Sequence, residues 1–187
     1  RKWKEAFKQL KFQNNKTTFS NFYQNKSFKI LSLKEIGFEK TEIKFSEPTL
    51  SKKLIGDYNK TRDFPGLDAT TRIGVALRFG TISIRKCVDF ASKNNEVWLN
   101  ELIWREFYRH LMTYHPALCK HRPFIAWTDG VRWQEDESLL RAWQQGKTGY
   151  PIVDAAMCQL NETGWMHNRL RMITASFLVK DLLIDWR

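Results

Sequence analysis

The chain has 187 residues, of which 42% are hydrophobic and 14% aromatic, so it is long enough for one well-buried domain and is not a disordered polymer. Its formal net charge is +11, but residues 1–60 hold 14 Lys and Arg against 6 Asp and Glu, whereas residues 61–187 hold 17 against 14. Most of the excess charge therefore lies in a Lys-rich N-terminal flank that is typical of solvated surface. A nucleic-acid interface in the remainder must depend on individual arginines.

The cysteine spacing and the hydropathy of the sequence exclude further classes of protein. The thiols of Cys87, Cys119 and Cys158 have the spacing of neither a zinc site nor a disulfide framework, and their odd number fits a reducing compartment. No apolar run approaches the roughly 18 residues that span a membrane, and the charged start lacks the apolar core of a signal peptide. We therefore expect a cytoplasmic protein without a metal site. Because the chain does not begin with Met, we expect it to be part of a longer gene product.

Two zones differ along the chain. Residues 1–53 are rich in Lys, Asn, Phe and Ser, and we interpret them as an interdomain linker or flank. Within this zone, apolar residues at i, i+4 and i+7 predict a short amphipathic helix over Trp3–Leu10. From Leu54 onward the pattern is helical and strand-like alternation is scarce, so we expect residues 54–187 to form a mainly α domain.

Caps and breakers delimit five helices in the second zone. Proline favours the first position of a helix and glycine the residue that follows one. The predicted helices are Ile84–Ala91 after an N-cap at Ser83, Glu96–His110 with Pro116 ending any continuation, Leu139–Gln145 closed by Gly146, Pro151–Leu160 with Asp154 in its first turn, and His167–Asp185.

The helix over Glu96–His110 carries a strip of chemically active side chains. At 3.6 residues per turn, Trp98, Glu101 and Arg105 share one face, and Trp104 and Tyr108 follow Glu101 at i+3 and i+7. One interpretation is a core helix with two charges at its margin. The other is a cavity in which a planar aromatic ligand stacks and a partly buried Glu101 contacts it. Desolvation would keep that carboxyl protonated, so that it could donate to a base carbonyl.

Residues 163–172 form a second dense segment. Asn168, Arg171 and Met172 share a helix face, while Arg169 lies about a quarter turn away. Two arginines beside an amide at a helix start suit phosphate and base contacts, although a solvated helix end would have the same composition. A lone His167 is more often a hydrogen-bonded structural residue than a ligand.

A third segment runs from Tyr58 to Gly74. Small hydroxyl residues before an apolar helix leave backbone N–H groups free for a phosphate, although Thr70 and Thr71 also fit ordinary helix capping. Seven of the eight tryptophans lie in residues 98–187. Core packing is the usual role of a tryptophan, and stacking on a ligand is the less common one.

Taken in this order, these segments resemble the photolyase/cryptochrome family, most closely its bacterial class I cyclobutane pyrimidine dimer photolyases. The resemblance covers residues 58–187. It is carried by Tyr58 with Arg62–Pro65, Thr70–Gly74, Trp98–Tyr108, Gly146–Asp154 and Gly164–Met172. It implies the helical FAD-binding domain of that family, here incomplete at both ends, and a lesion that is flipped out of the duplex.

The resemblance also implies roles for individual positions. The positions that match FAD-binding ones are Tyr58, Thr70, Thr71, Arg72, Ile73, Gly74, Trp98, Arg105 and Arg171. The positions that match those at the lesion are Glu101, Trp104, Asn168 and Met172, and the DNA contacts add Arg62, Arg105, Tyr108 and Arg169. Trp133 and Trp186 match two members of the tryptophan chain that carries electrons to the flavin.

The implied function is light-driven repair of UV-damaged DNA by electron transfer from reduced FAD to a pyrimidine dimer. The implied protein is a monomer of the bacterial cytosol or nucleoid that has no membrane partner. Asn168 and Met172 favour repair over the alternative, a cryptochrome-like photoreceptor. A further alternative is an inactive fragment that binds DNA through its Lys-rich flank. An antenna chromophore of folate or deazaflavin type is expected only in an N-terminal domain, and a carboxylate partner of Arg171 only after residue 187.

Overall fold

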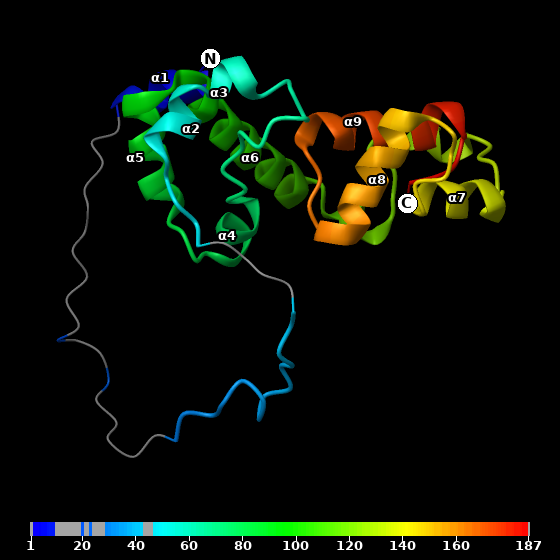
Figure 1. The fold of residues 1–187 in the computed structure, drawn as a ribbon. Helices are drawn as coiled ribbons and strands as arrows, with labels where there is room; N and C mark the ends of the chain where they lie inside the picture. Colours follow the sequence, from blue (N-terminus) through cyan, green and yellow to red (C-terminus); the bar gives the residue numbers. More distant parts are fainter. Residues whose placement is uncertain (1, 10–19, 21–22, 24–28, 43–46, 187) are drawn as a thin grey trace. The chain divides into compact units, whose positions relative to one another are not determined.

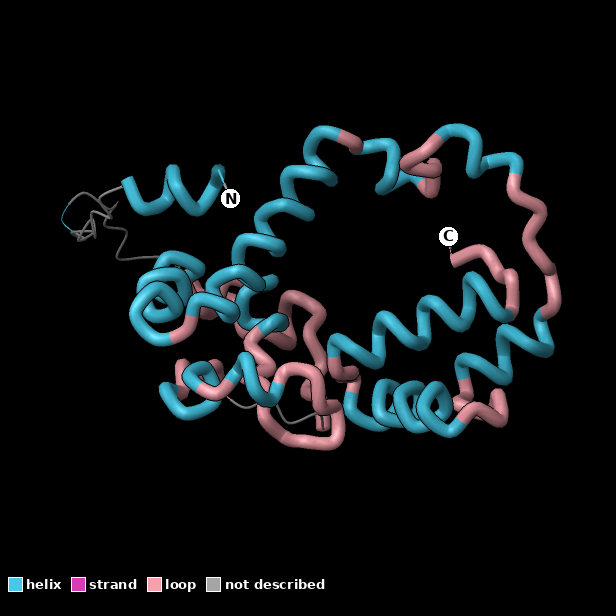
Figure 2. Tube along the Cα trace, turned by 90° about the horizontal axis from the view of Figure 1, so that it is seen from above, coloured by secondary structure: helices cyan, strands magenta, loops and turns pink. Residues whose placement is uncertain are grey.

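The computed structural model describes residues 2–9, 20, 23, 29–42 and 47–186 and divides the chain into two compact units, Arg1–Phe45 and Ser46–Arg187 (Figure 1). Helix α1 (Lys2–Gln9) belongs to the first unit and agrees with the predicted amphipathic helix, whereas Leu10 and the side chains of Trp3 and Phe7 lie outside the described residues. Among the residues that the structure describes there are helices and loops but no strand (Figure 2). The prediction of a mainly α fold is confirmed. The proposed boundary between residues 53 and 54 stays a prediction.

The first helical group of the second unit builds its core around two consecutive helices. Helix α5 packs on α6, α2 packs on α5, and α3 packs on α6. The bounds are α2 (Lys52–Gly56), α3 (Tyr58–Thr61), α4 (Gly74–Phe79), α5 (Ile84–Asn94) and α6 (Glu96–Tyr114). The buried apolar residues of this group are Ile55, Ile73, Ile82, Cys87, Val88, Ala91, Trp98, Leu99 and Leu102.

Asn95 fixes the start of the long helix α6. Its Oδ1 accepts hydrogen bonds from the backbone N–H of Val97 (2.9 Å) and Trp98 (3.1 Å), which would otherwise lack partners at a helix start. Its Nδ2 donates to the Gly56 carbonyl at 3.0 Å and so ties α6 to the end of α2. The predicted helices Ile84–Ala91 and Glu96–His110 are both present as α5 and α6, and their C-terminal ends extend three and four residues further. The predicted N-cap Ser83 has extended backbone angles but its side chain makes no capping hydrogen bond.

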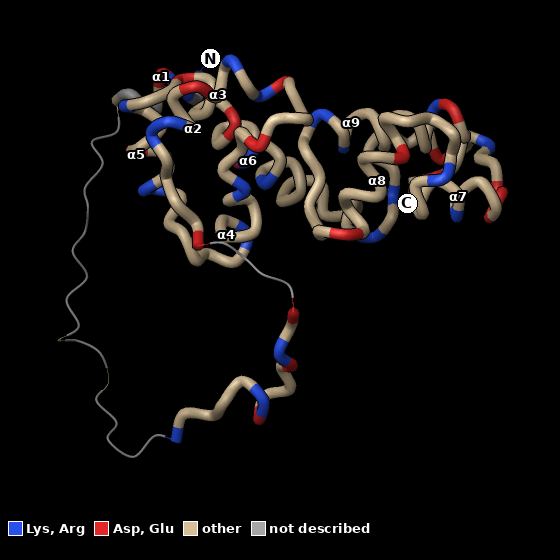
Figure 3. The backbone as a smooth tube through the Cα atoms, in the orientation of Figure 1, with Lys and Arg blue, Asp and Glu red and all other residues tan. Residues whose placement is uncertain are grey.

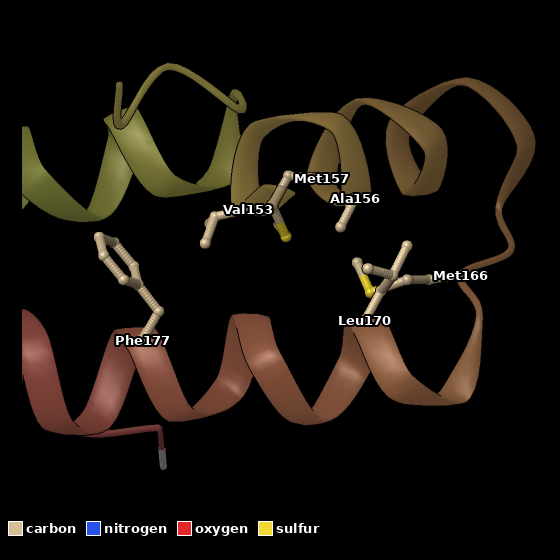
Figure 4. Packing of buried hydrophobic residues seen from close by; sticks show 6 residues of the cluster. All are labelled: Val153, Ala156, Met157, Met166, Leu170 and Phe177. Carbon is tan, nitrogen blue, oxygen red and sulfur yellow. The ribbon is translucent and has the colours of Figure 1, made fainter. Parts of the chain in front are cut away.

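The second helical group comprises α7 (Glu137–Gln144), α8 (Pro151–Thr163) and α9 (Asn168–Ser176), preceded by the 3₁₀ turns η2 (Pro116–Lys120) and η3 (Ala126–Gly130). Helix α8 packs on both α7 and α9. The cluster between α8 and α9 consists of Val153, Ala156, Met157, Met166, Leu170 and Phe177 (Figure 4). The indole Nε1 of Trp143 donates to the Thr174 carbonyl at 3.1 Å and joins α7 to α9.

The junction between α7 and α8 requires glycine. Gly146 has φ +65°, and a Cβ there would lie 2.7 Å from the Asp154 carbonyl oxygen and 2.8 Å from Cys158 Sγ. Asp154 closes the same junction by accepting from the Thr148 hydroxyl (2.6 Å) and from the backbone N–H groups of Thr148 (2.7 Å) and Gly149 (2.9 Å). The Thr148 hydroxyl is the largest cause that lowers the pKa of Asp154. The predicted closure of α7 by Gly146 therefore has a direct steric reason.

The prediction of one helix over His167–Asp185 is wrong in its second half. Helix α9 ends at Ser176 and a π-helical turn, η4 (Phe177–Asp181), follows it. The Leu182 N–H donates to the Phe177 carbonyl at 3.0 Å, which widens the hydrogen-bond ring, and Leu183 then adopts φ +52°. A non-glycine residue in the left-handed region ends the helix, because it cannot continue the α-helical backbone.

Candidate functional site

A chain of alternating charges links the two helical groups of the second unit. The Arg62 Nη1 lies 2.8 Å from Glu101 Oε1 on α6, and its Nε lies 3.7 Å from the neighbouring Asp63 Oδ1. The same Asp63 oxygen accepts from Arg169 at the start of α9, at 2.7 Å from Nε and 2.6 Å from Nη2. We call Arg62, Asp63, Glu101 and Arg169 the ion-pair network. It brings three of the predicted site residues together.

Tyr58 and Met172 flank this network. The Arg62 guanidinium lies 5.3 Å from the centre of the Tyr58 ring, within the range of a cation–π contact. Burial of the Tyr58 hydroxyl raises its pKa, and the nearby Glu101 carboxylate raises it further. At the other end, Arg169 Nη1 lies 3.7 Å from Met172 Sδ. Residues that are predicted to contact the cofactor, the lesion and the DNA therefore lie next to one another.

The surroundings of Glu101 differ from the desolvated, ligand-facing setting that the sequence predicts. Its Oε1 forms an ion pair with Arg62 Nη1 at 2.8 Å. The side chain is also only partly buried, at 32% exposure. Sequence spacing could not reveal Arg62 as the partner, because the two residues are 39 positions apart in different segments.

The aromatic residues of α6 divide between the core and the surface. Trp98 is only 5% exposed and contributes to the core, so its predicted contact with FAD is not evident in its position. Trp104 and Tyr108 are 53% and 58% exposed, and their rings stack at 6.1 Å with an interplanar angle of 30°. Phe107 meets the edges of both rings. The exposed part of α6 therefore presents a small aromatic surface beside Glu101.

The segment before α4 has a strained, well-anchored backbone. Arg72 adopts φ +49°, which is costly for a side chain with a Cβ. Its guanidinium lies 4.4 Å from the centre of the Trp165 ring, and its Nη2 lies 2.9 Å from Asp68 Oδ1. Ile73 is buried and anchors the segment in the core. The Arg72 side chain therefore holds the segment in place through Trp165 and Asp68.

Thr70 carries an unsatisfied group within this segment. Its Oγ1 is buried and has no hydrogen-bond partner among the described residues, whereas Thr71 is half-buried and Gly74 exposed. A buried hydroxyl without a partner is costly unless a ligand or water satisfies it. The unsatisfied Thr70 hydroxyl therefore fits a phosphate-bearing cofactor bound at this segment.

A pocket of about 710 Å³ adjoins α4 and α6 and includes Gly74 and Arg105 among its lining residues. Arg105 is half-buried; its Nη2 donates to the Leu77 carbonyl at 3.1 Å and its Nη1 pairs with Glu106 at 2.9 Å. Arg78 and Arg109 also line the pocket. Three arginines therefore line a pocket that includes Gly74 of the Thr70–Gly74 segment, and two of them, Arg105 and Arg109, pair with Glu106.

The start of α9 is organised by His167. This buried residue is the N-cap, and its Nδ1 accepts from the Arg169 N–H at 3.2 Å, which confirms the structural interpretation of the histidine. Asn168 is exposed beside it. Arg171 is also exposed, and its Nε donates to the Met166 carbonyl at 2.9 Å, so its guanidinium has a hydrogen-bond partner within the described residues.

The two predicted electron-transfer tryptophans lie on connected segments. The Gln134 N–H donates to the Leu183 carbonyl at 2.8 Å, which joins the chain next to Trp133 with the chain leading to Trp186. The Trp133 Nε1 is buried and has no hydrogen-bond partner among the described residues, and Trp186 is 68% exposed. Their electron-transfer role stays a prediction.

Two residues of the site, Asp63 and Trp165, are not among those predicted from the sequence. Asp63 connects Arg62 with Arg169, and Trp165 supports Arg72. The adjacent opposite charges at positions 62 and 63 indicate a charged surface, but they do not indicate that Asp63 pairs with Arg169, 106 positions later. No sequence signal placed Trp165 against a segment that lies more than ninety positions earlier.

Residues 98–187 match the family described as the FAD binding domain of DNA photolyase. This match places residues 98–187 in the FAD-binding domain of the DNA photolyase family, and the helical fold agrees with it. Among named relatives, the chain is 64% identical over 141 residues to a deoxyribodipyrimidine photo-lyase of Escherichia coli, covering 71% of this chain and 30% of that protein. It is 50% identical over 145 residues to the enzyme of the same name from Vibrio cholerae, covering 73% and 31%.

Solved structures show the same fold. An archaeal photolyase from Sulfolobus tokodaii, whose structure contains two FAD molecules, has a TM-score of 0.67 at 39% identity, covering 72% of this chain and 32% of its own. A cryptochrome from Synechocystis has a TM-score of 0.63 at 34% identity, covering 72% and 30%. The chain thus spans about a third of the length of these proteins.

Two further observations concern the described part of the chain. Its helices include none with the length and apolar composition that crossing a bilayer requires. Within the same residues, His, Cys, Asp and Glu side chains form no group of three that could hold a metal ion.

Proposed function

We propose that residues 54–187 form part of a photolyase that repairs cyclobutane pyrimidine dimers in UV-damaged DNA. The observation that carries this proposal is the ion-pair network, which joins Glu101 beside the aromatic surface of α6 to Arg169 and Met172 on α9. One helix supplies stacking surface and a hydrogen-bonding carboxylate, and the other supplies an arginine and a soft apolar side chain. Together they suit an extruded pair of pyrimidines.

The segment before α4 is suited to hold FAD. The unsatisfied Thr70 hydroxyl and the Arg72 backbone held by Trp165 offer a fixed, polar seat for its phosphates, and Arg105 adds a positive charge at the adjoining pocket. Bound reduced FAD supplies the light-driven electron that opens the dimer ring. The remaining proposed contacts are those of Tyr58, Thr71, Ile73, Gly74, Trp98 and Arg171.

The protein's own side chains then position the lesion. Trp104 presents an exposed ring on which a flipped base stacks, because indole and pyrimidine faces stack without regard to sequence. Glu101 accepts hydrogen bonds from base N–H groups, and Arg62 holds its carboxylate in place. Arg169, Asn168 and Tyr108 contact the DNA around the lesion, and their contacts with phosphates set register rather than sequence preference.

The Thr70 hydroxyl provides a direct test of the cofactor site. Thr70→Val replaces a buried hydroxyl that has no partner among the described residues with a methyl group of similar size. We expect FAD, titrated by quenching of its fluorescence, to bind about tenfold more weakly, because one ligand hydrogen bond is lost. The thermal stability of the FAD-free protein should not fall.

Thr113→Val is the matched control, because Thr113 is exposed near the end of α6, its hydroxyl donates to the Arg109 carbonyl at 2.9 Å, and it has no proposed cofactor contact. FAD affinity should be unchanged in this variant. Equal FAD affinity in Thr70→Val and the unchanged chain would show that Thr70 is not a ligand. Absence of FAD binding by the unchanged chain would contradict the proposed function.

The structural likeness to a cryptochrome supports one alternative, a blue-light photoreceptor. Both functions require FAD, so flavin binding does not separate them. A photoreceptor would leave dimers intact under blue light, whereas the proposed repair enzyme removes them. Because Met172 lies beside Arg169 on an exposed helix start, where a lesion can reach it, repair is the function that we favour.

A further inference from the structure

Asp63 has an unusual place in the ion-pair network. A single carboxylate oxygen, Oδ1, accepts from Arg169 through both Nε and Nη2, at 2.7 and 2.6 Å, and lies 3.7 Å from Arg62 Nε. The Asp63 side chain is 56% exposed, whereas that of Arg62 is 24% exposed. Two arginines from separate helical groups therefore converge on one anionic oxygen that solvent and ligands can reach.

A phosphate oxygen could take the position that Asp63 Oδ1 occupies between the two arginines. Guanidinium groups bind carboxylates and phosphates with the same planar set of donors. A DNA phosphate that approaches Arg169 must therefore compete with Asp63 for the same N–H groups, beside the positive charge of Arg62, whose Nε lies 3.7 Å from Asp63. The negative charge of Asp63 also repels the phosphate until the arginines turn away from it.

We propose that Asp63 is a positioning residue that holds Arg62 and Arg169 in the geometry of a phosphate site and competes with the phosphate for that site. This inference rests on the proposed function. Undamaged DNA must displace Asp63 without gaining the contacts of an extruded base. Damaged DNA displaces it and also gains the contacts with Trp104 and Glu101. Asp63 thereby increases discrimination in favour of the dimer.

Asp63→Asn tests the competition, because the amide keeps the shape of the side chain and removes its charge. Fluorescence anisotropy on the full chain should show binding to an undamaged duplex strengthened about fivefold, with a smaller gain for a duplex carrying one thymine dimer. The dependence on salt concentration should become steeper for undamaged DNA, because one more cation pairs with phosphate. Asp63→Glu keeps the charge and should restore weak binding to the undamaged duplex.

Asp89→Asn is the matched control. Asp89 pairs with Lys93 at 2.7 Å on the exposed surface of α5, so the variant makes the same change in net charge outside the network. It should bind both duplexes like the unchanged chain. Equal strengthening by Asp63→Asn and Asp89→Asn would reduce the effect to net charge and overturn the proposal. Weakened binding of the undamaged duplex in Asp63→Asn would overturn it as well.

The pairing itself is measured without DNA. Phenylglyoxal modifies free guanidinium groups, so mass spectrometry of the treated protein should show Arg169 reacting several-fold faster in Asp63→Asn, with Arg141 unchanged as an internal reference. Equal reactivity of Arg169 in the unchanged chain and in Asp63→Asn would overturn the role of Asp63 and leave the proposed function unaffected. If neither duplex binds the unchanged chain, the proposed DNA-binding function fails, and the phosphate role of Asp63 fails with it.

Discussion

At the scale of single residues, His167 serves as an N-cap only while its imidazole is neutral. Its Nδ1 must accept the Arg169 N–H, which a protonated ring cannot do. Burial is the main cause that lowers the pKa of His167, and the positive charges of Arg169 and Arg171 lower it further, whereas Asp63 raises it. The folded protein therefore resists protonation of this histidine more than the unfolded chain does.

This difference predicts a loss of stability in mild acid. Below the unfolded pKa, close to 6.5, the unfolded chain takes up a proton that the folded protein excludes, so the free energy of unfolding falls until the pH drops below the folded pKa. His167→Asn keeps an N-cap acceptor that does not titrate. Urea unfolding between about pH 7.5 and about pH 5.5 should show a flatter pH dependence in the variant. Identical pH dependence in both proteins would contradict this account.

Which residues share a helix face could be predicted from the sequence, but which residues meet across helices could not. Spacing placed Glu101 and Arg105 on one face of α6, and their half-buried positions agree. The partners Arg62 and Leu77 come from other elements, and Arg169 pairs with Asp63 across 106 positions. Such pairs depend on how helices pack, which periodicity within one helix does not specify.

At the scale of elements, the turn from α7 to α8 combines a left-handed glycine with close packing. Gly146→Ala should lower the free energy of unfolding by about 2–4 kcal/mol, because the new Cβ both strains the backbone and meets the Asp154 carbonyl. Gly164→Ala is the control: this glycine has φ +67°, but a Cβ added there would meet no packed neighbour within 4 Å.

Gly164→Ala should cost only about 1 kcal/mol, the strain of the left-handed backbone alone. Chemical unfolding of the two variants under one set of conditions gives the comparison. Equal losses would mean that the contact with Asp154 and Cys158 relaxes freely, and the steric explanation of this turn would be wrong.

Helix starts were predictable where a proline or a capping side chain marks them, as at Pro151. The π-helical turn was not predictable. Buried residues continue at helical spacing from Leu170 through Thr174 to Phe177 and Leu178, so the hydrophobic pattern gives no sign that the backbone changes. The change is set by the Phe177–Leu182 hydrogen bond and the left-handed Leu183, which are features of the backbone alone.

At the scale of the whole molecule, the candidate site draws on both helical groups of the second unit. Helix α6 carries charged residues of both signs, whereas those of α3 and of the start of α9 are basic (Figure 3). The network through Asp63 and the stacking of Arg72 on Trp165 each connect the two groups. The family and the helical fold could be predicted because long motifs carry them. The roles of the individual site residues depend on ligands, which the spacing of residues within one helix does not specify.

The central claim is tested most directly by dimer splitting under blue light. The chain, saturated with reduced FAD without oxygen, is mixed with an oligonucleotide that carries one thymine dimer, and dimer loss is followed by chromatography. We expect dimers to disappear in the light and not in the dark. Glu101→Ala should slow the loss roughly tenfold without changing flavin content. Persistence of all dimers in the light, with reduced FAD demonstrably bound, would contradict the assignment of repair to these residues.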